Sequence, residues 1–333
     1  MLKFSRRSDI GSTAIVSGPM PAAKRPRFQR HMTNLTLLLM GAPSLLLLLV
    51  FNYLPMGGIV IAFKDFRFNK GLWGSDWVGL KNFEFFFTSE SAWRVTRNAL
   101  LLNAAFIITG TVLSVALALM LFEMGRWAVK VYQTVFFFPY FLSWVVVSYA
   151  AYALLSSDFG AINGLLSSLG LEPVIWYSEP KYWAAILIIA NFWKNGGYSM
   201  LLYYTNLTSV DVSLYEAAAI DGANGMQKVR HISLPMLTPL VVMLTLLSIG
   251  RIFYSDFGMF FFLPRNSGAL YPVTDVIDTY VYRALRLSGE IGMAAASGFY
   301  QSVVGFVLIL EIGRASCRGS VYISVVAVTF KNG

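Results

Sequence analysis

Charged residues are scarce in this sequence: only 13% of its 333 residues are Asp, Glu, Lys or Arg, whereas 56% are hydrophobic. An ordinary soluble domain has about 25% charged residues. The apolar residues also gather in runs of about 20, the length that a helix needs to cross a bilayer. The low charge therefore excludes an ordinary soluble domain and predicts an integral membrane protein.

Cysteine and histidine are nearly missing as well. Cys317 is the single cysteine, so the chain has no disulfide framework, and His31 and His231 are too few for a zinc site of the usual kind. The sequence also lacks the G-x-x-x-x-G-K-[ST], G-x-S-x-G and H-E-x-x-H motifs. We therefore assign no catalytic residue, metal or cofactor to this chain, and predict that it is not an enzyme.

The positive charge is concentrated at the amino terminus. The formal net charge is +9, and before position 32 only Asp9 opposes the basic residues Lys3, Arg6, Arg7, Lys24, Arg25, Arg27 and Arg30. A basic arm directly before an apolar run is typical of a cytoplasmic anchor at the lipid surface, and not of a nucleic-acid-binding domain. No apolar h-region follows the early arginines, which excludes a secretory signal. We expect residues 1–34 to form a cytoplasmic arm.

Six apolar runs are long enough to cross a membrane: roughly 35–63, 97–122, 131–155, 183–206, 236–262 and 292–311. The predicted fold class is therefore all-α, a polytopic membrane protein with six transmembrane helices over residues 35–310. The first run contains Pro43 and Pro55, at which a span can tilt or break. With the basic arm inside, the loops 123–130 and 207–235 lie in the cytoplasm.

The segments 64–96, 156–182 and 263–291 then face outside. One of them holds "VGLKNFEFFF" (78–87), whose aromatic residues beside Lys81 and Glu84 favour a helix on the membrane surface, or else an ordinary connecting loop. Asp275 and Asp278, in the last of these segments, are candidates for contact with a soluble partner, although solvated loop charges are the commoner case.

A polar island, "YEAAAIDGANGMQKVRHISLPMLTPL" (215–240), interrupts the apolar second half of the chain. Ser213 and Glu216 match a capping box at the start of a helix, and Gly222 stands where that helix would end in a left-handed residue. A second helix is expected from about Asn224. This pattern predicts a helix–turn–helix elbow, whose first helix is too short to be stable alone and needs a surface to dock against.

The island resembles the EAA signature of binding-protein-dependent ABC importer permeases. Glu216-Ala217-Ala218 is followed by three residues, Gly222, nine residues, and Ile232-x-Leu234-Pro235. Further stretches, among them "FNYLPMGGIVIAFKDFRF" and "GALYPVTDVIDTYVYRAL", resemble the LplB-type permeases of the carbohydrate-uptake branch over about residues 35–310. The resemblance implies a MetI-like fold in a bacterial plasma membrane, with the amino terminus cytoplasmic.

The resemblance also implies partners and roles. The chain would pair with a homologous second permease, a cytoplasmic ABC ATPase that binds and hydrolyses the ATP, and an extracytoplasmic solute-binding lipoprotein. The loop 207–235 would carry a coupling helix for the ATPase, with the motif residues Glu216, Ala217, Ala218, Asp221, Gly222, Ala223 and Pro235. The solute would be a sugar or oligosaccharide. A non-sugar solute, a polytopic membrane enzyme using Asp275 and Asp278, and a membrane scaffold without a transport role remain as alternatives.

Two cations lie inside predicted spans, which is costly in lipid unless they face a partner or water. Lys194 stands next to Asn191 and Asn195, and Arg251 lies five residues before Asp256. With Tyr140, the residues Lys194, Asn191 and Arg251 are candidates for a translocation path. The alternative is an ion pair that fixes helix packing, or a contact with the partner permease.

The segment 311–333 departs from the pattern. Glu311 ends the last apolar run, and "VYISVVAVTF" is β-branched and strand-like. The LplB-type permeases instead continue into a short basic end. A frame change or sequence junction near Leu310 is one interpretation, an unusual genuine terminus the other, and no function is assigned to this tail.

Overall fold

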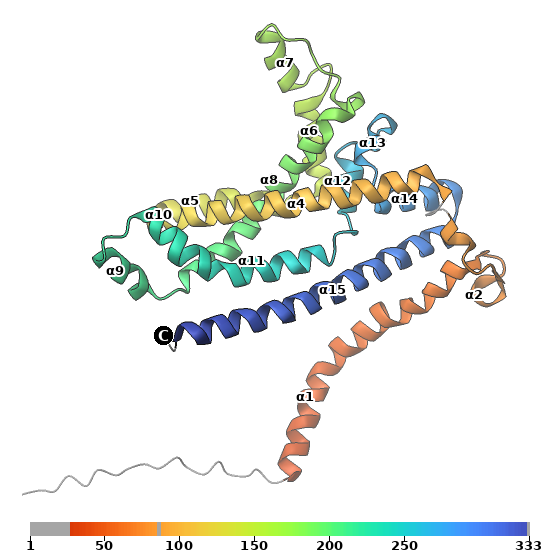
Figure 1. Ribbon diagram of the computed structural model, residues 1–333. Coiled ribbons are helices and arrows are strands. Elements are labelled where there is room, and N and C mark those ends of the chain that lie inside the picture. The colour runs from red at the N-terminus through yellow and green to blue at the C-terminus, as the bar shows by residue number, and fades with distance from the viewer. Residues whose placement is uncertain (1–26, 85–87, 332–333) are drawn as a thin grey trace, which may run out of the picture. The chain divides into compact units, whose positions relative to one another are not determined.

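The computed structural model describes residues 27–84 and 88–331, and the chain divides into two units, 1–57 and 58–333 (Figure 1). In the first unit α1 (Arg27–Leu48) is followed by a π-helical turn, η1 (Leu49–Tyr53). The 3₁₀ helix η2 (Leu54–Phe63) then continues into the second unit. The stretch Leu38–Phe63 is long and apolar enough to cross a membrane, as expected. Most of the basic arm, residues 1–26, lies outside the described residues.

The second unit begins with a small antiparallel hairpin, β1 (Lys64–Asp65) and β2 (Asp76–Trp77), which encloses the one-turn helix α2 (Gly71–Gly74). The segment 78–87, expected as a surface helix or a connecting loop, contains a 3₁₀ turn, η3 (Lys81–Phe83), followed by a helical residue at Glu84. Asn82 ties this turn to the preceding segment, because its amide donates to the carbonyls of Ala62 and Lys64 at 2.9 and 3.0 Å. Residues 85–87 of this segment are outside the described residues.

The remaining helices follow in order: α4 (Glu90–Phe122), α5 (Arg126–Phe137), η4 (Phe138–Phe141), α6 (Trp144–Leu155), α7 (Ala161–Ser168), η5 (Trp176–Ser178), η6 (Pro180–Tyr182), α8 (Trp183–Thr208), α9 (Val212–Ile220), α10 (Gly225–Lys228), η7 (Val229–Ser233), α11 (Leu234–Ile249), α12 (Phe257–Phe262), η8 (Gly268–Leu270), α13 (Tyr271–Thr274), α14 (Ile277–Arg283), η9 (Ala284–Ser288) and α15 (Ile291–Lys331). The all-α prediction is therefore confirmed, with the two-residue strands as a minor addition.

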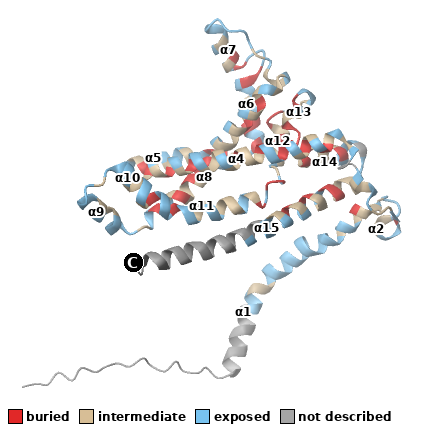
Figure 2. Cartoon of the chain, viewed as in Figure 1, coloured by how far each residue is buried: buried red, intermediate tan, exposed pale blue. Residues whose placement is uncertain are grey.

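Helix α8 packs along α4 and is also flanked by α5 and α11, so buried residues concentrate on these helices and on α12 and α14 (Figure 2). Small residues permit the close approach. A Cβ on Gly197 would lie 1.9 Å from the Phe136 carbonyl oxygen, so α5 and α8 can meet there only because Gly197 has no side chain. Ser114 of α4 donates to the Gly196 carbonyl at 3.2 Å on another side of α8.

Two of the six expected spans are interrupted. The run 131–155 consists of α5–η4 and α6, which meet at an angle of 101°. Pro139 lacks the N–H that a continuous helix would need, and Ser143 restarts the chain as N-cap of α6 by accepting from the Val146 N–H. The run 236–262 breaks after Ile249, and Asp256 starts α12 by accepting from the Met259 N–H at 3.3 Å.

Within the described residues, four stretches are long and apolar enough to cross a membrane: Leu38–Phe63, Glu90–Phe122, Gly225–Ile249 and Ile291–Glu311. The count becomes five if the bent pair α5–η4/α6 is one span. Helix α8 has 26 residues, but Asn191, Lys194 and Asn195 in its middle make it more polar than these stretches. Polar side chains at that depth lie inside a bundle or against a partner rather than against lipid.

The strand-like prediction for the carboxyl-terminal tail is wrong, because α15 continues through that segment to Lys331. β-propensity depends on packing against neighbouring strands, and the described residues offer none there. An existing helix extends without repeating the unfavourable nucleation step, so β-branched residues are accepted at the end of α15.

Candidate functional site: an exposed elbow and a polar pocket

The elbow, defined here as residues 209–235, joins α8 to α11. Its first helix, α9, begins after Asp211, whose carboxylate accepts from the Ser213 N–H at 2.9 Å. The predicted capping box of Ser213 and Glu216 is therefore wrong: the cap lies two residues earlier, where the acidic side chain reaches the free N–H groups of the first turn. That hydrogen bond lowers the pKa of Asp211.

The turn of the elbow is as predicted. Gly222 has φ +79°, the left-handed conformation that favours glycine. The N–H of Ala223 donates to the Ala218 carbonyl at 2.9 Å, and that of Gly222 to the Ala219 carbonyl at 3.1 Å, which closes the end of α9. Asn224 and Gln227 then form a reciprocal capping box at the start of α10. Local hydrogen bonds thus fix both helices of the elbow.

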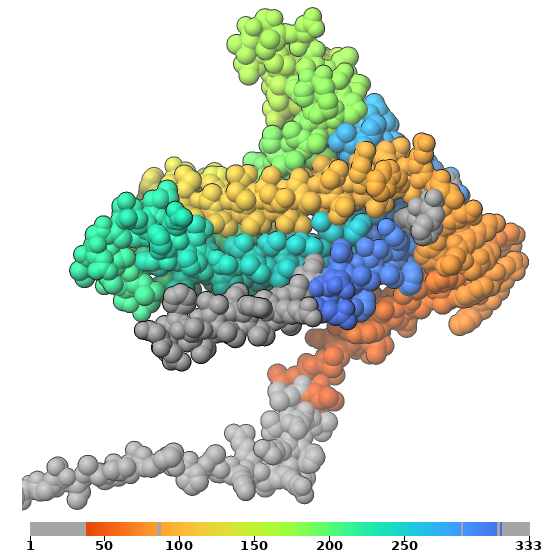
Figure 3. Space-filling model, in the orientation of Figure 1, coloured from red at the N-terminus to blue at the C-terminus, as the bar shows by residue number. Residues whose placement is uncertain are grey.

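The tip of the elbow is bare. Ile220 is 87% exposed and Met226 75% exposed, on either side of the turn, and Figure 3 shows the elbow, in blue-green, at one end of the second unit. Glu216 and Ala217 are exposed as well. A cavity of about 330 Å³ inside the turn is lined by Ala218, Asp221, Gly222, Ala223, Gln227, Lys228, His231 and Ile232. Pro235 is exposed in the first turn of α11.

Tyr215 holds the elbow to the helices, a contact that the sequence analysis missed. Its ring packs on Phe122 at the end of α4, with centroids 5.4 Å apart, and its hydroxyl hydrogen-bonds the hydroxyl of Ser233 at 3.0 Å. Ser233 is fully buried. The sequence offered one signal for this contact, the aromatic residue Tyr215 directly before Glu216-Ala217-Ala218. The α4–α5 loop and the elbow therefore lie at the same end, as predicted from the alternation of spans.

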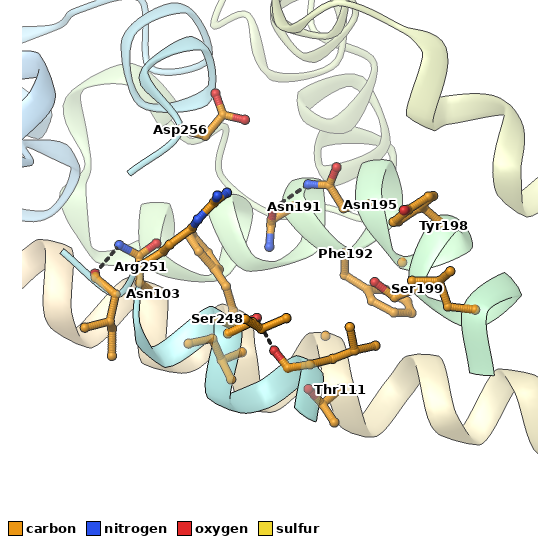
Figure 4. A pocket seen from close by; sticks show the side chains of 18 of the residues that line it. Asn103, Thr111, Asn191, Phe192, Asn195, Tyr198, Ser199, Ser248, Arg251 and Asp256 are labelled. Carbon is orange, nitrogen blue, oxygen red and sulfur yellow. Dashed lines mark hydrogen bonds between the residues drawn. The ribbon is translucent and has the colours of Figure 1, made fainter. Parts of the chain in front are cut away.

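A pocket of about 640 Å³ lies between α4, α8 and the broken end of α11 (Figure 4). We call it the polar pocket because amide, hydroxyl and charged side chains gather on its otherwise apolar walls. Its polar or aromatic lining includes Asn103, Thr111, Asn191, Asn195, Tyr198, Ser199, Ser248, Arg251, Tyr254 and Asp256. Of the four residues predicted to line a path, Asn191 and Arg251 do line this pocket, whereas Lys194 and Tyr140 do not. Tyr140 stacks on Tyr198, with centroids 4.9 Å apart, and so stands directly behind the wall.

Lys194 is buried, and it makes no ion pair with a described carboxylate. Its ammonium donates to the Tyr140 carbonyl at 3.0 Å, at the break between η4 and α6. The same ammonium lies over the rings of Tyr140 and Trp144, 5.5 and 5.4 Å from their centroids. The break in the predicted span frees backbone carbonyls, and Lys194 satisfies one of them. An ion pair that fixes helix packing, the alternative for Lys194, is therefore not formed with any carboxylate of the described residues.

Asp256 forms part of the same wall. One carboxylate oxygen accepts from the Trp144 indole and the other from the Met259 N–H at the start of α12. Both oxygens thus have donors, and the amino-terminal end of α12 adds a favourable dipole.

Asp275 and Asp278 do not stand free in solvent: the first is buried and the second half-buried. Asp275 is 1% exposed, and Arg283 and Arg94 pair with its carboxylate. Asp278 accepts from the Ser255 N–H at 2.9 Å, and burial raises the pKa of its carboxyl. Asp275 is therefore a packing residue, and the suggestion that it meets a soluble partner is wrong.

Three features indicate the class of this protein: an all-helical fold with several membrane-crossing stretches, a bare elbow at one end, and a polar pocket beside two helix breaks. Together they are typical of a membrane transport subunit. The chain belongs to the family described as "Binding-protein-dependent transport system inner membrane component", whose model matches residues 110–310. Members are permeases of ABC importers, so this multi-pass membrane protein is a permease and the polytopic-enzyme alternative is wrong.

Relatives support the same assignment. The chain is 35% identical over 279 residues to the polygalacturonan/rhamnogalacturonan transport system permease protein YteP of Bacillus subtilis, covering 84% of this chain and 86% of YteP. It is 34% identical over 274 residues to Protein LplB of the same organism, covering 82% and 86%. A solved bacterial ABC transporter for import of the acidic polysaccharide alginate is similar, with TM-score 0.80, 30% identity, and 87% and 98% of the two chains covered. The predicted LplB-type resemblance is confirmed.

Proposed function

We propose that the elbow is the coupling element of this permease and docks on a cytoplasmic ABC ATPase. The observation that carries the proposal is the bare apolar tip. Ile220 and Met226 stand on either side of a turn that its own hydrogen bonds make rigid, Ile220 outside the candidate membrane spans and Met226 at the very start of one, and the described residues contain nothing that covers them. Exposed apolar side chains on a rigid polar element favour a protein partner.

The EAA residues fit the same role. Glu216 and Ala217 are exposed on α9, while Asp221, Gly222 and Ala223 line the turn cavity beside Lys228 and His231. A side chain of the ATPase could enter this cavity, which carries both signs of charge. Tyr215 and Ser233 would then pass a displacement of α9 to α4 and α11, because they connect the elbow to both helices.

The proposal extends to the solute and to the orientation. The described functions of YteP and of the alginate transporter favour a carbohydrate for this chain too, with a non-sugar solute as the alternative. If the elbow docks on a cytoplasmic ATPase, it lies on the cytoplasmic side of the membrane. The alternation of the six predicted spans then puts the amino terminus on the same side. A homologous second permease and an extracytoplasmic lipoprotein would complete the importer, and Asn191 and Arg251 would line the path of the solute between the two permeases.

A capture experiment tests the coupling assignment. The chain is co-expressed with its partner permease and candidate ATPase, and Ile220→Glu/Met226→Glu is compared with the wild type. We expect the ATPase to co-purify with the wild type and not with the double variant. Phe159→Glu is the matched control, since Phe159 is 91% exposed and lies outside the elbow. Equal capture by all three proteins would contradict the proposal.

A further inference from the structure

The loop 64–80, which contains β1, α2 and β2 and is called the hairpin loop here, carries large apolar side chains in the open. Trp73 in α2 is 90% exposed and Phe68 is 84% exposed, and Trp77 and Leu80 are exposed as well. Figure 2 shows the loop around α2 largely in pale blue. Four exposed side chains of this size in one short loop indicate a surface that another molecule covers.

The hairpin loop is held in one conformation by its own hydrogen bonds. Ser75 is buried, and its hydroxyl donates to the Gly71 carbonyl at 2.6 Å and accepts from the Arg67 N–H at 3.1 Å. The Arg67 carbonyl accepts from the N–H groups of Lys70 and Gly71, both at 3.0 Å, and Gly71 has the left-handed φ of +66°. The exposure of Trp73 is therefore that of a fixed turn.

The charges of the hairpin loop are paired within it. Lys70 pairs with Asp76 at 2.8 Å and Arg67 with Asp65 at 2.9 Å. The Lys64 ammonium donates to a backbone carbonyl of α2 at 2.9 Å. Long basic side chains suit a lipid surface, since their stems lie along apolar groups while their charged ends stay in water. These cations are therefore compatible with aromatic rings that enter lipid beside them.

The start of the hairpin loop is fixed to the end of a candidate membrane span. The stretch Leu38–Phe63 ends directly before the loop begins. The Phe63 ring stacks on Trp77, with centroids 5.9 Å apart, and the Val78 N–H donates to the Phe63 carbonyl at 2.9 Å. Both strands of the loop are thus attached to the last residue of that span.

The hairpin loop is also fixed to the beginning of a second span, in α15. The Phe63 ring packs edge-on against Phe299, with centroids 5.7 Å apart. A Cβ on Gly292 would lie 2.6 Å from the amide nitrogen of Asn82, so the turn after the loop rests on the first turn of α15. The span Ile291–Glu311 has 21 residues, a helix of about 30 Å that only just crosses the hydrocarbon core. Its first turn therefore lies at the membrane surface, and the loop lies beside it.

We propose that the hairpin loop is an anchor in the headgroup layer of the bilayer, with Trp73 and Phe68 inserted among the lipids. Tryptophan favours this depth, because its ring combines an apolar body with an N–H that needs a polar acceptor. Lipid is the occupant because the attachments to two span ends hold the loop at the depth of the headgroups. Such an anchor would fix the depth of both span ends, and it does not depend on the role of the elbow.

A fluorophore at position 73 tests this placement. Trp73→Cys is made in the Cys317→Ser chain, labelled with bimane, and reconstituted with the partner permease in vesicles of phosphatidylethanolamine and phosphatidylglycerol. A lipid with a nitroxide near its headgroup should quench the label more strongly than either a lipid with a nitroxide at its chain end or aqueous iodide. Phe68→Cys should behave in the same way.

Ile220→Cys in the same background is the matched control, because Ile220 is 87% exposed on a turn outside the candidate spans. Iodide should quench its label, and neither lipid should. A label at position 73 that behaves like the label at position 220 would overturn the proposal. Absence of quenching by any of the three reagents would also overturn it, and would show that protein covers the loop. Iodide quenching that disappears when the solute-binding protein is added would assign the loop to that partner instead.

Intrinsic fluorescence gives a second measurement that needs no label. The wild type and Trp73→Phe are compared in vesicles whose lipids carry bromine near the headgroup. The difference between their emission spectra isolates Trp73 from the other tryptophans, and bromine should remove most of this difference. An equal difference in brominated and ordinary lipid would contradict the anchor.

Discussion

The elbow and the polar pocket are built in opposite ways. The elbow is contiguous in sequence, is fixed by hydrogen bonds between residues a few positions apart, and exposes Ile220 and Met226. The pocket draws its lining from α4, α8 and the end of α11, which together span more than 140 positions of the chain, and its wall depends on Lys194 and Trp144, which do not line it.

This difference explains how each region responds to substitution. A change at the exposed tip of the elbow, away from Tyr215 and Ser233, acts on a local turn and on what docks there, and leaves the packing of the helices untouched. A change at the pocket wall acts on the helix breaks that hold several elements together. The first should therefore alter coupling without altering stability, and the second should alter both.

The largest effect is expected from Gly222→Val. A β-branched residue at φ +79° costs about 1 kcal/mol or more, and one to two kcal/mol changes a conformational population roughly 5- to 30-fold. We expect uptake to fall by a similar factor while the protein stays in the membrane, measured as ATP-driven uptake with an immunoblot of the membrane fraction. Gly170→Val carries the same strain, at φ +75° outside the elbow, and should leave ATPase capture unchanged. A normal uptake rate in Gly222→Val would remove the coupling role from this turn.

Lys194→Met tests the pocket wall. The Tyr140 carbonyl loses its donor at the η4–α6 break, which costs about 1–3 kcal/mol, less the gain from no longer burying a charge. Both the thermal unfolding temperature in detergent and the uptake rate should fall. Lys130→Met, at an exposed lysine of α5, is the control and should change neither. Unchanged stability with lost uptake would mean that Lys194 meets the solute directly, and the pocket would have to be extended to include it.

A smaller effect is expected from Tyr215→Phe. The phenyl ring keeps the contact with Phe122, but the hydrogen bond to Ser233 is lost, at a cost of about 1 kcal/mol. ATPase capture should persist, and more ATP should be hydrolysed for each solute imported. Tyr132→Phe serves for comparison, because Tyr132 is half-exposed on α5 and packs on Phe136. An unchanged ratio of ATP hydrolysed to solute imported would show that the elbow moves α11 by another contact.

The smallest effect concerns pH. The Ser213 N–H lowers the pKa of Asp211 in the folded chain, so this cap contributes stability above the unfolded pKa of about 4 and loses it as the pH falls through the folded value. The protection of the α9 amides against hydrogen exchange, measured relative to the intrinsic rate at each pH, should therefore fall below about pH 4. Asp211→Asn keeps a capping oxygen without the titration, so its exchange should lack this acid step. Identical acid profiles would exclude Asp211 as the cap that matters.

The sequence anticipated the elbow better than the helices around it. The position of Gly222, the start of the second helix at Asn224 and the family signature were readable because each depends on neighbouring residues. The cap at Asp211 was missed, although it too is local, because Ser213 and Glu216 offered a competing match to the same pattern. Hydropathy gave the apolar runs but not their breaks at Pro139 and Gly250, because a broken helix and a continuous one have the same composition.

The sequence by itself determined the membrane class, the importer family, the lack of a nucleotide-binding motif and the geometry of the turn, all of which follow from composition or from residues close together in the chain. Only the tertiary structure decided what each charged residue does. Lys194 binds a carbonyl, Asp275 lies between two arginines, and Arg251 is left facing the pocket. The partner of a charge is the group that folding brings to it: Tyr140 lies 54 positions from Lys194, and Arg94 pairs with Asp275 from the other half of the chain.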